Sequence, residues 1–483
     1  MNSSNSRYYN MKKTITKTFV VLSLLMAGAA DLYAQSAIYA CGHIRRTRET
    51  AITNLKNSGY TTAILFNVNV ENDGSLTTDF SWDTQTAAEA GGIICQNGEY
   101  VFDKYQPYYI DDVKSLVTQP TSINRLEICI GGWGNGSYGH IRDYINRYGT
   151  GEETTLYKNF KALKEAIPEI VAVNNDQEQD YDLETAVAFH RMLAKIGYKT
   201  TIAPYMNRTY WQNLVSQLNE EPGTCEIVYL QTYGGGAGNN PNDWRVFGDI
   251  PMYVGFDCEA SSNLSDMESR FKNWRDAADV QGGFLWNYNS EARNVNEWAT
   301  AINRIFPTKT VEKPAARFYQ DVNYGGYFVS MPEGSFCKAE MALYGIRAND
   351  ITSFKLKDGY KVTLYSGDNF DGESMTWTES TGWIGNDWND KACSMKIESI
   401  NTGIDNVSDG ASAGLTAAVS ADGTSVIVSG AAAGQVGIYS VSGEKLAETT
   451  ASADGSATLS ASSFPNGVYV VKAANGSAKL LKR

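Results

Sequence analysis

The chain lacks the features that would tie it to a membrane, to nucleic acid or to a metal cluster. After its first 34 residues, no apolar run approaches the roughly 18 residues that a membrane-spanning helix requires. Basic residues number only 41 against 54 acidic ones, and a net charge of −13 gives no reason to expect a nucleic-acid partner. The seven cysteines include no C-x-x-C pair of the kind that marks metal sites. No glycine-rich phosphate loop follows the first apolar run, which disfavours a doubly wound nucleotide-binding sheet.

What is present is a chain long enough for about three domains, with a leader at its start. Three lysines within residues 12–17 precede an apolar run at 19–30, and a small-residue pattern at 32–34 follows. This order of segments predicts a signal peptide at residues 1–34 and favours Met11 as the true start. Its removal takes away four basic residues and one acidic residue, which lowers the net charge from −13 to −16. We therefore expect a secreted or cell-surface protein.

The cysteines are expected to be buried and inert, because most stand beside apolar residues in strand-like segments. Their odd number leaves at least one thiol free, while export permits one or two disulfides. Cys337 and Cys393 are the first pair to test, since both fall in one small domain. The full set is Cys41, Cys95, Cys129, Cys225, Cys258, Cys337 and Cys393.

Between residues 36 and 307, eight short apolar runs alternate with longer amphipathic stretches. Eight strand–helix units over about 270 residues match the size of a TIM barrel. We therefore predict an α/β fold, a (β/α)8 TIM barrel, at 35–308, with an open doubly wound sheet as the alternative. The predicted strands are 37–44, 62–67, 126–132, 170–178, 199–205, 226–233, 251–256 and 282–288, and predicted helices include 47–58, 155–166, 184–196, 210–218 and 266–278.

Two small all-β domains are expected after the barrel, which makes the chain multidomain. Beyond a linker at 309–314, residues 315–400 change to short strands, aromatic residues and glycine turns without helices. They fall into two similar halves, an internal repeat of roughly 40 residues. A second linker at 401–414 leads to residues 415–483, whose alternating pattern and low aromatic content suit a small β-sandwich.

Polar side chains end the fourth predicted strand. Asn174, Asp176 and Glu178 follow the apolar run 170–173 at a spacing of two, which in a β-strand turns them toward one face. Two carboxylates on one face hold the pKa of at least one of them high, as a general acid requires. Because the chemistry of such barrels lies at the carboxyl ends of the strands, this segment is the predicted catalytic centre. The alternative is a polar strand end that only meets solvent.

Four patterns along the predicted strands carry a family resemblance. Residues 129–132 match a third-strand Ser-x-Gly-Gly, and the fourth strand matches Asp-x-x-Asp-x-Asp-x-Glu with Val171 and Asn174 in place of the first two acids. The sixth-strand pattern appears as residues 231–234, and Trp286 stands at the place of an eighth-strand tryptophan. With these patterns the barrel resembles glycoside hydrolase family 18, the chitinases and endo-β-N-acetylglucosaminidases.

The resemblance implies roles for individual residues. Glu178 would protonate the glycosidic oxygen, and the substrate's own 2-acetamido oxygen would attack in place of a second carboxylate. Asp176 would orient the acetamide and stabilise the oxazolinium, and Tyr233 would hydrogen-bond the acetamide carbonyl. No cofactor is implied for catalysis. A packing role alone is the alternative for Tyr233 and Trp286. The residues expected to bind the sugar are Asn174, Gln231, Trp286, Tyr205, Asn207 and Trp133.

The two lost acids leave more than one function open. In the family their role is to tune Asp176, and Asn174 can still donate a hydrogen bond to it. Removing a like charge should lower the pKa of Asp176 and Glu178 and shift the pH optimum downward. The Gln231-x-Tyr233 pattern favours an endo-β-N-acetylglucosaminidase acting on N-glycans. A chitinase and a non-catalytic glycan-binding lectin are the alternatives.

The repeat in residues 315–400 resembles a βγ-crystallin domain, a pair of Greek-key motifs. Microbial members bind calcium through Asn/Asp-Asn/Asp-x-x-Ser/Thr-Ser, and the two copies are aligned here as 349–354 and 389–394. The first copy keeps an oxygen at Ser353, whereas Cys393 is a poor ligand for Ca²⁺. We predict one weak calcium site; the alternatives are turn caps without a cation, and a surface or matrix protein in which this domain is the working part. The predicted calcium ligands are Asn349, Asp350 and Ser353.

The end of the chain resembles the C-terminal sorting domain of type IX secretion in the Bacteroidetes. The resemblance rests on residues 435–440, 465–471 and the basic end 479–483. It implies passage across the outer membrane with the secretion machinery as a partner. A carbohydrate-binding sandwich is the alternative, disfavoured because residues 415–483 contain two Tyr, one Phe and no Trp with which to stack sugars.

Overall fold

The computed structural model describes residues 35–40, 47–78, 92–288, 294–307, 311–400, 414–420, 422–441 and 443–482. The predicted signal peptide, Cys41 and nearly all of the 401–414 linker lie outside these residues. The chain forms two compact units. The first holds the barrel and most of residues 315–400, and the second holds the C-terminal domain together with Leu356–Val362 and Trp377–Glu379.

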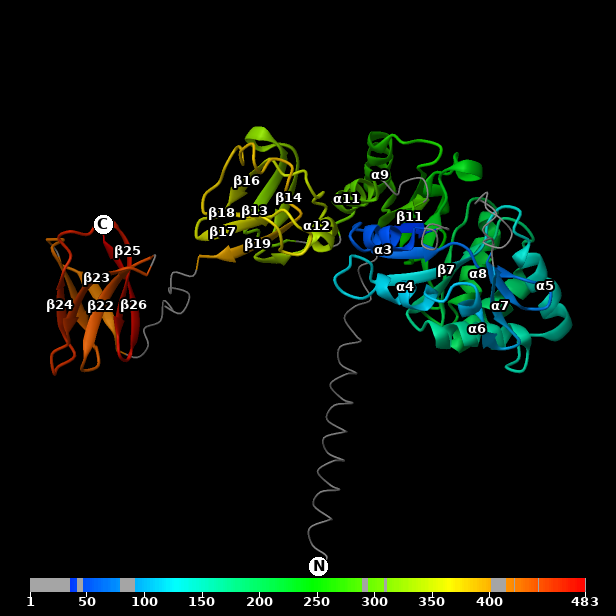
Figure 1. Ribbon diagram of the computed structural model, residues 1–483, viewed down its shortest axis with the longest axis horizontal. Helices are drawn as coiled ribbons and strands as arrows, with labels where there is room; N and C mark the ends of the chain where they lie inside the picture. The colour runs from blue at the N-terminus through cyan, green and yellow to red at the C-terminus, as the bar shows by residue number, and fades with distance from the viewer. Residues whose placement is uncertain are drawn as a thin grey trace, which may run out of the picture. The chain divides into compact units, whose positions relative to one another are not determined.

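Eight parallel strands close into a barrel, as the eight apolar runs predict (Figure 1). Neighbouring strands are hydrogen-bonded in the order β1-β12-β11-β10-β9-β8-β7-β2, and each overlaps one predicted run. The strands are β1 (Ser36–Ala40), β2 (Thr62–Leu65), β7 (Arg125–Gly131), β8 (Ile170–Asp176), β9 (Lys199–Ile202), β10 (Cys225–Leu230), β11 (Met252–Asp257) and β12 (Gly282–Trp286).

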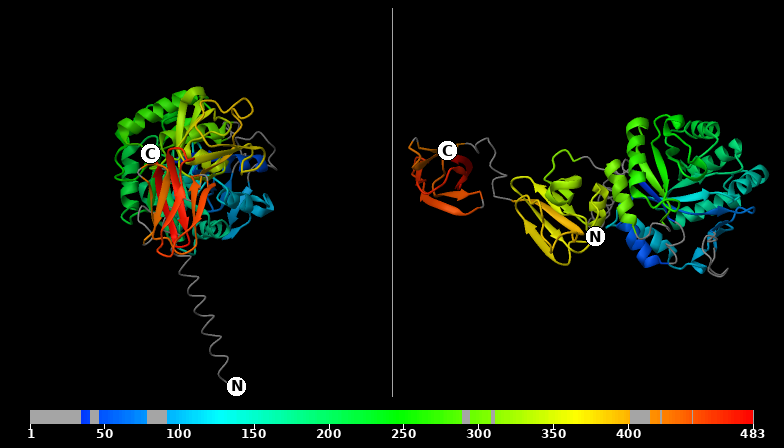
Figure 2. Two further views of the ribbon diagram at one scale, coloured as in Figure 1. Left: turned by 90° about the vertical axis from the view of Figure 1, so that its left-hand side faces the viewer. Right: turned by 90° about the horizontal axis from the view of Figure 1, so that it is seen from above.

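Helices connect these strands along the chain (Figure 2). Most of their buried residues join one large apolar cluster with strand residues, whereas Trp211, Leu214 and Val215 belong to a second cluster. Short-range signals set their ends. The Asp182 carboxylate accepts a hydrogen bond from the Thr185 amide at the start of α7, and Gly197 ends that helix with a φ of 106°. The helices are α3 (Arg48–Lys56), α4 (Tyr109–Leu116), α5 (Ser137–Tyr148), α6 (Thr155–Ala166), α7 (Leu183–Ile196), α8 (Arg208–Leu218), α9 (Leu264–Ala278) and α11 (Val295–Ile305), with 3₁₀ turns η1 (Phe102–Lys104), η2 (Gly234–Gly236) and η3 (Pro241–Trp244).

The barrel interior is filled by side chains rather than left open. The Tyr229 ring lies 5.5 Å from the rings of both Tyr253 and Phe284, and Tyr39 lies 5.8 Å from Phe284. This packing closes the barrel below its mouth, so that a cleft can form only at the ends of the strands. After β2 a separate antiparallel sheet is inserted, made of β3 (Asn69–Val70), β4 (Leu76–Thr78), β5 (Gly92–Gln96) and β6 (Glu99–Tyr100).

Residues 315–400 form two antiparallel sheets, of order β14-β13-β16 and β15-β19-β17-β18. The expectation that this region has no helix is wrong, because α12 spans Lys338–Tyr344. Glu340 accepts a hydrogen bond from the Cys337 amide as part of a capping box, and Gly345 ends the helix with a φ of 93°. The other elements are β13 (Ala316–Asp321), η4 (Val322–Tyr324), β14 (Gly325–Met331), β15 (Gly334–Phe336), β16 (Ser353–Leu356), β17 (Tyr360–Tyr365), β18 (Ser374–Trp377) and β19 (Ser394–Ser399).

The C-terminal domain consists of two antiparallel sheets, β20-β21-β24 and β23-β22-β25-β26. Alternate residues of β21 and β22, such as Val426, Val428, Val436 and Ile438, are buried in one apolar cluster shared by both sheets. The strands are β20 (Thr416–Val419), β21 (Ser425–Ser429), β22 (Gln435–Ser440), β23 (Lys445–Thr450), β24 (Ala457–Ser460), β25 (Gly467–Ala473) and β26 (Gly476–Lys482).

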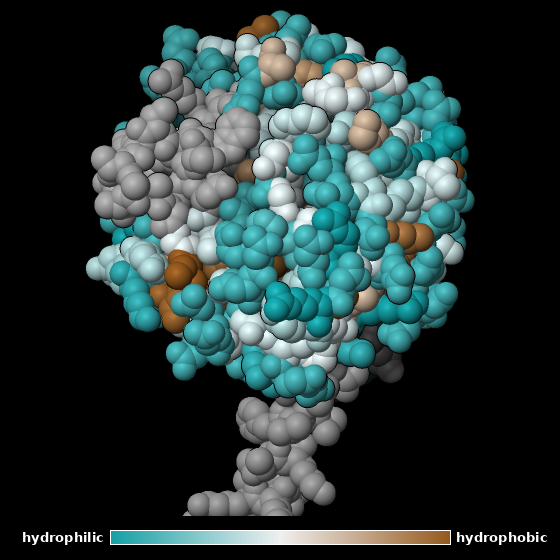
Figure 3. Space-filling view, turned by 90° about the vertical axis from the view of Figure 1, so that its right-hand side faces the viewer, coloured by the Kyte–Doolittle hydropathy of each residue, from teal (hydrophilic) through white to brown (hydrophobic). Residues whose placement is uncertain are grey.

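Hydrophilic residues dominate the face shown in Figure 3, and the apolar residues on it form small, separate spots. Within the residues that the structure describes, no helix has both the length and the apolar character needed to cross a membrane.

Candidate active site

A cleft of about 550 Å³ opens at the carboxyl ends of the barrel strands. It contains both acids of the fourth predicted strand together with residues at or just after the carboxyl ends of β2, β7, β9, β10, β11 and β12. Seven of the nine predicted barrel-site residues are therefore brought together. The lining residues are Phe66, Asn67, Gly131, Gly132, Trp133, Gly134, Asn135, Asp176, Glu178, Tyr205, Gln231, Tyr233, Gly234, Gly235, Asp257 and Trp286.

Asp176 is positioned by a very close approach of β7 to β8. It is the last residue of β8 and pairs in register with Gly131, while the Gly132 amide donates a hydrogen bond to its backbone carbonyl at 2.7 Å. Gly131 has a φ of 117°, and a Cβ on it would lie only 2.1 Å from the Asp176 carbonyl oxygen. Only glycine fits at this position. The Gly-Gly pair of the third-strand pattern thus allows β7 to approach the end of β8 closely.

The two acids have environments that favour protonation. Asp176 is only 5% exposed; burial, and then the nearby charge of Glu178, raise its pKa well above the usual range. Burial also raises the pKa of the half-buried Glu178, and a hydrogen bond from Gln231 opposes that rise. Gln231 Nε2 donates to Asp176 Oδ1 at 2.8 Å and to the Ala203 carbonyl at 3.0 Å. Such a pair retains a proton for general acid catalysis.

Tyr233 is placed beside this pair as a hydrogen-bond donor. Burial, followed by the charge of Asp176, raises its pKa well above the ordinary value, so its hydroxyl stays protonated. Its ring needs the glycine that faces it on β11, because a Cβ on Gly255 would lie 2.4 Å from the Tyr233 ring. The predicted role as a donor is compatible with this position.

Aromatic side chains form the walls of the cleft. Trp286, half-buried at the end of β12, packs 4.9 Å from Phe66 and 5.4 Å from Tyr39. Trp133 is 72% exposed and lies on the loop after β7, whereas Tyr205 is buried at 8% exposure. Aromatic faces at this depth suit the apolar C–H faces of a sugar ring.

Asn174 and Asn207, which were expected to bind the sugar, do not line the cleft. Asn207 is exposed and precedes α8 in the left-handed region with a φ of 55°. Asn174 is fully buried below the cleft, where it accepts from the Tyr39 hydroxyl at 3.0 Å and donates to Thr201 Oγ1 at 2.9 Å. The Asn174 amide nitrogen thus donates to Thr201 rather than to Asp176, where the sequence allowed a hydrogen bond.

Asp257 is a site residue that the sequence reasoning missed. It ends β11 and lines the cleft; burial raises its pKa, opposed by the amides of Glu259 and Ala260, which donate to its Oδ1 at 2.9 and 3.1 Å. The signal was available, because an acid directly after an apolar run is the same pattern that identified Asp176. The predicted strand simply stopped one residue short, at 256.

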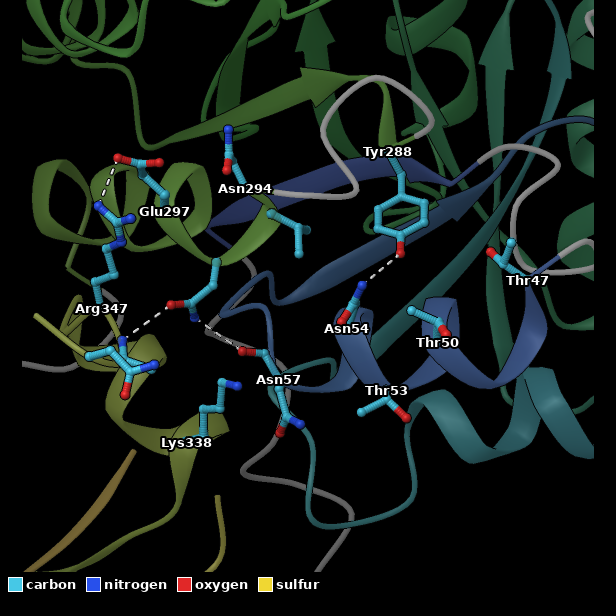
Figure 4. Close-up of a pocket in the computed structure, with 14 residues that line it drawn as sticks. Thr47, Thr50, Thr53, Asn54, Asn57, Tyr288, Asn294, Glu297, Lys338 and Arg347 are labelled. Atoms are coloured by element: carbon cyan, nitrogen blue, oxygen red, sulfur yellow. Dashed lines mark hydrogen bonds and ion pairs between the residues drawn. The ribbon is translucent and has the colours of Figure 1, made fainter. Parts of the chain in front are cut away.

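A second cavity, of about 650 Å³, is lined by α3, α11 and residues 338–349 (Figure 4). Its polar groups pair with one another: Asn54 donates to the Tyr288 hydroxyl at 3.5 Å, and Arg347 donates to Glu297 at 2.8 Å. Glu297 is the carboxylate among its lining residues. A single carboxylate paired with arginine offers no acid–base pair, so the smaller cleft is the better candidate for catalysis.

The repeat in residues 315–400 has a different register from the predicted one. The Asn349 amide donates to the Ala392 carbonyl and the Asp390 amide donates to the Ile351 carbonyl, so Asn349 corresponds to Asp390. The same offset holds further along, since the hydroxyls of Ser353 and Ser394 both donate to backbone carbonyls, at 2.6 and 2.7 Å. Cys393 therefore corresponds to Thr352 rather than to Ser353, and the first copy begins at Ala348.

The three predicted calcium ligands each have their own partner. Asn349 Oδ1 accepts from the Cys393 thiol at 3.1 Å, Asp350 accepts from the Tyr327 hydroxyl at 2.8 Å, and Ser353 bonds to backbone. In the corrected register, the first copy begins at Ala348 and its fifth residue, Thr352, contacts an asparagine of the second copy. Thr352 Oγ1 donates to Asn389 Oδ1 at 2.8 Å, which places two side-chain oxygens together. In the described part of the chain, no group of three or more His, Cys, Asp or Glu residues could hold a metal.

The cysteines agree with the expectation of buried thiols. All six described cysteines are buried and none of them is in a disulfide, so Cys337 and Cys393 do not form the bridge that was to be tested first. Burial raises the pKa of both thiols, which keeps them protonated.

Comparison with known proteins identifies one part of the chain. A βγ-crystallin domain from Clostridium beijerinckii is 42% identical to this chain over 17% of its length and 95% of that domain, with a TM-score of 0.17. A βγ-crystallin domain from Flavobacterium johnsoniae is 29% identical over 18% of this chain and 94% of that one, with a TM-score of 0.17. Part of this chain is therefore similar in sequence to βγ-crystallin domains.

This βγ-crystallin-like domain has a curated relative as well. Development-specific protein S homolog of Myxococcus xanthus is 32% identical over 96 residues, which are 19% of this chain and 54% of that protein. The chain spans about half the length of the curated relatives it matches. No protein-family model matches the chain.

Proposed function

We propose that the barrel is a (β/α)8 glycoside hydrolase that cleaves β-1,4-linked N-acetylglucosamine with participation of the substrate's acetamido group. The observation that carries this proposal is the pair Asp176 and Glu178 in the cleft at the carboxyl ends of the strands, where Gln231 donates a hydrogen bond to Asp176. Both pKa values are raised, as a pair that must hold and release one proton requires.

The proposed reaction gives each of these groups one step. Glu178 gives its proton to the glycosidic oxygen as the bond to the anomeric carbon breaks, and the acetamido oxygen forms a new bond to that carbon. Asp176 stabilises the positive oxazolinium, and Tyr233 donates a hydrogen bond to the acetamido group. Water then attacks the anomeric carbon and gives a proton to Glu178, which restores the acid. The configuration at that carbon is retained.

The substrate we favour is the diacetylchitobiose core of N-glycans. Support comes from the Gln231-x-Tyr233 pattern and from an exposed Trp133 at the rim, which can stack on one sugar of a soluble glycan. The test is to incubate the mature chain with a high-mannose glycoprotein and to measure its mass. The expected result is a loss that leaves one N-acetylglucosamine on asparagine. Glycan binding without any mass loss would favour the lectin, and release of chitobiose from chitin would favour the chitinase.

A second function is favoured for the βγ-crystallin-like domain, namely binding of one Ca²⁺ ion. The supporting observation is the Thr352–Asn389 oxygen pair, because Ca²⁺ takes only oxygen ligands. The opposite pair, Asn349 with Cys393, offers a sulfur and suits Ca²⁺ poorly. One double mutant of clostrillin, a similar protein, has been solved in complex with nickel. The test is calorimetric titration of the chain with Ca²⁺, in which one weak site per chain is expected.

The export route remains part of the proposal. The leader at residues 1–34 directs secretion, and the C-terminal sandwich acts as the sorting domain for type IX secretion. The absence of tryptophan from residues 415–483 argues against a sugar-binding role. Deleting residues 415–483 should leave the protein in the periplasm, detected by cell fractionation.

A further inference from the structure

The barrel interior below the cleft holds a carboxylate that the proposed reaction does not use. Glu127 lies on β7 and is completely buried. It accepts hydrogen bonds from Arg125 Nε at 2.6 Å, from the Tyr229 hydroxyl at 3.1 Å and from Thr201 Oγ1 at 2.5 Å. All three contacts are donors, and a carboxylate accepts hydrogen bonds without donating any, so this environment suits it.

A chain of hydrogen bonds leads from this carboxylate toward the cleft, and its direction is fixed. The Thr201 hydroxyl has a single hydrogen, which it gives to Glu127, so its oxygen must accept from Asn174 Nδ2. The Asn174 amide is thereby oriented with its carbonyl oxygen toward Tyr39. The hydroxyl of Tyr39 gives its only hydrogen to that oxygen at 3.0 Å. All four side chains are at most 1% exposed, so water does not interrupt the chain.

The upper end of the chain lies under the catalytic pair. Tyr39 packs against Trp286, which lines the cleft together with Asp176, and its hydroxyl bonds Asn174, two residues before Asp176 on β8. Burial, and then the charge of Asp176, raise the pKa of Tyr39. Because the hydrogen of Tyr39 points down to Asn174, its oxygen turns only lone pairs toward Asp176. A neighbour that cannot donate favours the protonated form of a carboxyl group.

We propose that Glu127 is a positioning residue for the hydrolase, which acts through Thr201, Asn174 and Tyr39 to withhold the Tyr39 proton from Asp176. This inference rests on the proposed function of the barrel. It gives Asn174 a role in place of the sugar binding expected from the sequence: an amide both accepts and donates, so it can transmit the hydrogen-bond direction set by the buried carboxylate. An ionised aspartate at that position could not donate to Thr201.

The experiment is Glu127→Gln, which keeps the shape but supplies a donor. The glutamine amide can donate to Thr201, after which Thr201 can donate to a flipped Asn174, and Tyr39 is free to donate to Asp176. A donor stabilises the ionised form of Asp176, so its pKa falls and the alkaline limb of the pH–rate profile should move down by about one pH unit. The matched control is Glu226→Gln. Glu226 also pairs with Arg125, at 3.0 Å, but it is not part of the chain, and its variant should keep the wild-type limb.

Two further variants distinguish the effect of hydrogen-bond direction from the effect of removing the Glu127 charge. Thr201→Val breaks the chain without removing a charge, and it should lower the alkaline limb in the same direction. Tyr39→Phe removes the last hydroxyl, so adding Glu127→Gln to Tyr39→Phe should produce no further shift. The proposal is overturned if Glu127→Gln and Glu226→Gln shift the limb equally, or if the Glu127→Gln shift persists without the Tyr39 hydroxyl.

A direct titration makes the test independent of turnover. ¹³C NMR of aspartate-labelled protein, with Asp176→Asn to assign the signal, reports ionisation of Asp176 in each variant that keeps the wild-type melting temperature. A shifted Asp176 titration in a chain with no turnover would uphold the inference and reject the hydrolase. Normal turnover with an unmoved titration would do the reverse. The titratable groups that face Asp176 are Glu178, Tyr39, Tyr138, Tyr181, Tyr205 and Tyr233. Those that face Glu127 are Arg125, Cys225, Glu226, Tyr229 and Tyr253.

Discussion

Asn174 in the barrel and Cys393 in the βγ-crystallin-like domain both stand where a family pattern has a different polar group, yet their surroundings differ. Asn174 is fully buried, and both ends of its amide are used, by Tyr39 and by Thr201. Cys393 offers one thiol to Asn349. The amide at position 174 is hydrogen-bonded at both ends by its buried neighbours. The thiol at position 393 instead replaces a candidate oxygen ligand of Ca²⁺, and sulfur cannot take over that role.

The largest expected effect tests whether the barrel hydrolyses glycans although Asn174 stands in place of an acid. Glu178→Gln removes the proton donor and should lower kcat for glycan release by about 10²–10⁴. Glu165→Gln is the control, because Glu165 lies on α6 with 68% of its side chain exposed. Both variants should melt at the wild-type temperature. Wild-type turnover in Glu178→Gln would place the acid elsewhere and leave the barrel as a binding module.

A comparison of two aspartates separates acetamide participation from the ordinary two-carboxylate mechanism. Asp176→Asn should reduce kcat by about 10² or more, because the oxazolinium loses its electrostatic partner. Asp257→Asn should have a much smaller effect, since Asp257 binds two backbone amides and has no assigned chemical step. Equal losses in both would indicate that Asp257 is a nucleophile, and a glycosyl-enzyme adduct on Asp257 would then be detectable by mass spectrometry.

The sequence predicted the features that depend on local residue patterns. It missed the contacts between residues that are far apart in the chain and meet only when the barrel closes. The eight strands and the acids at the end of β8 follow from alternation over a few residues, and the structure has both. The Tyr39–Asn174 bond joins residues 135 positions apart, so no local pattern contains it. The register of the repeat failed for another reason: Asn-Asp doublets occur in both copies, but the left-handed φ falls on Asn349 in one and on Asp390 in the other.

Restoring an acid in the barrel should affect stability more than chemistry. In Asn174→Asp the Thr201 hydrogen is already given to Glu127, so the new carboxylate, once ionised, would face the Thr201 oxygen without a donor. Burial raises the folded-state pKa of this new group, so stability is intact below the unfolded value of about 3.9 and is lost as pH rises. The melting temperature, measured from pH 4 to pH 8, should therefore fall increasingly below wild type. A constant difference across this range would mean that the new carboxyl group is solvated.

A smaller effect is expected from the calcium ligands. Millimolar Ca²⁺ should raise the melting temperature of the βγ-crystallin-like domain by roughly 4–8 °C for each kcal/mol of binding free energy. Thr352→Ala should abolish this rise, because it removes one of the two adjacent oxygens. Ser353→Ala should instead lower the melting temperature equally with and without Ca²⁺, since Ser353 bonds to the Asp321 carbonyl and the Tyr324 amide. Calorimetry of the mature chain in Ca²⁺ and in EDTA distinguishes the two variants.

The smallest expected effect comes from restoring the ligand that the βγ-crystallin-like domain lacks. Cys393→Ser replaces sulfur by an oxygen that can still donate to Asn349, but Ala348 at the start of the first copy supplies no side-chain oxygen to the same half of the repeat. The Ca²⁺-dependent rise in melting temperature should therefore grow by less than Thr352→Ala takes away. Adding Ala348→Asn to Cys393→Ser should enlarge the gain, and calorimetric titration should then give two sites per chain. If Cys393→Ser alone created the second site, the sulfur of Cys393 would be the only reason that this site is missing. The lack of a side-chain oxygen at Ala348, which follows from the corrected register, would then not affect Ca²⁺ binding.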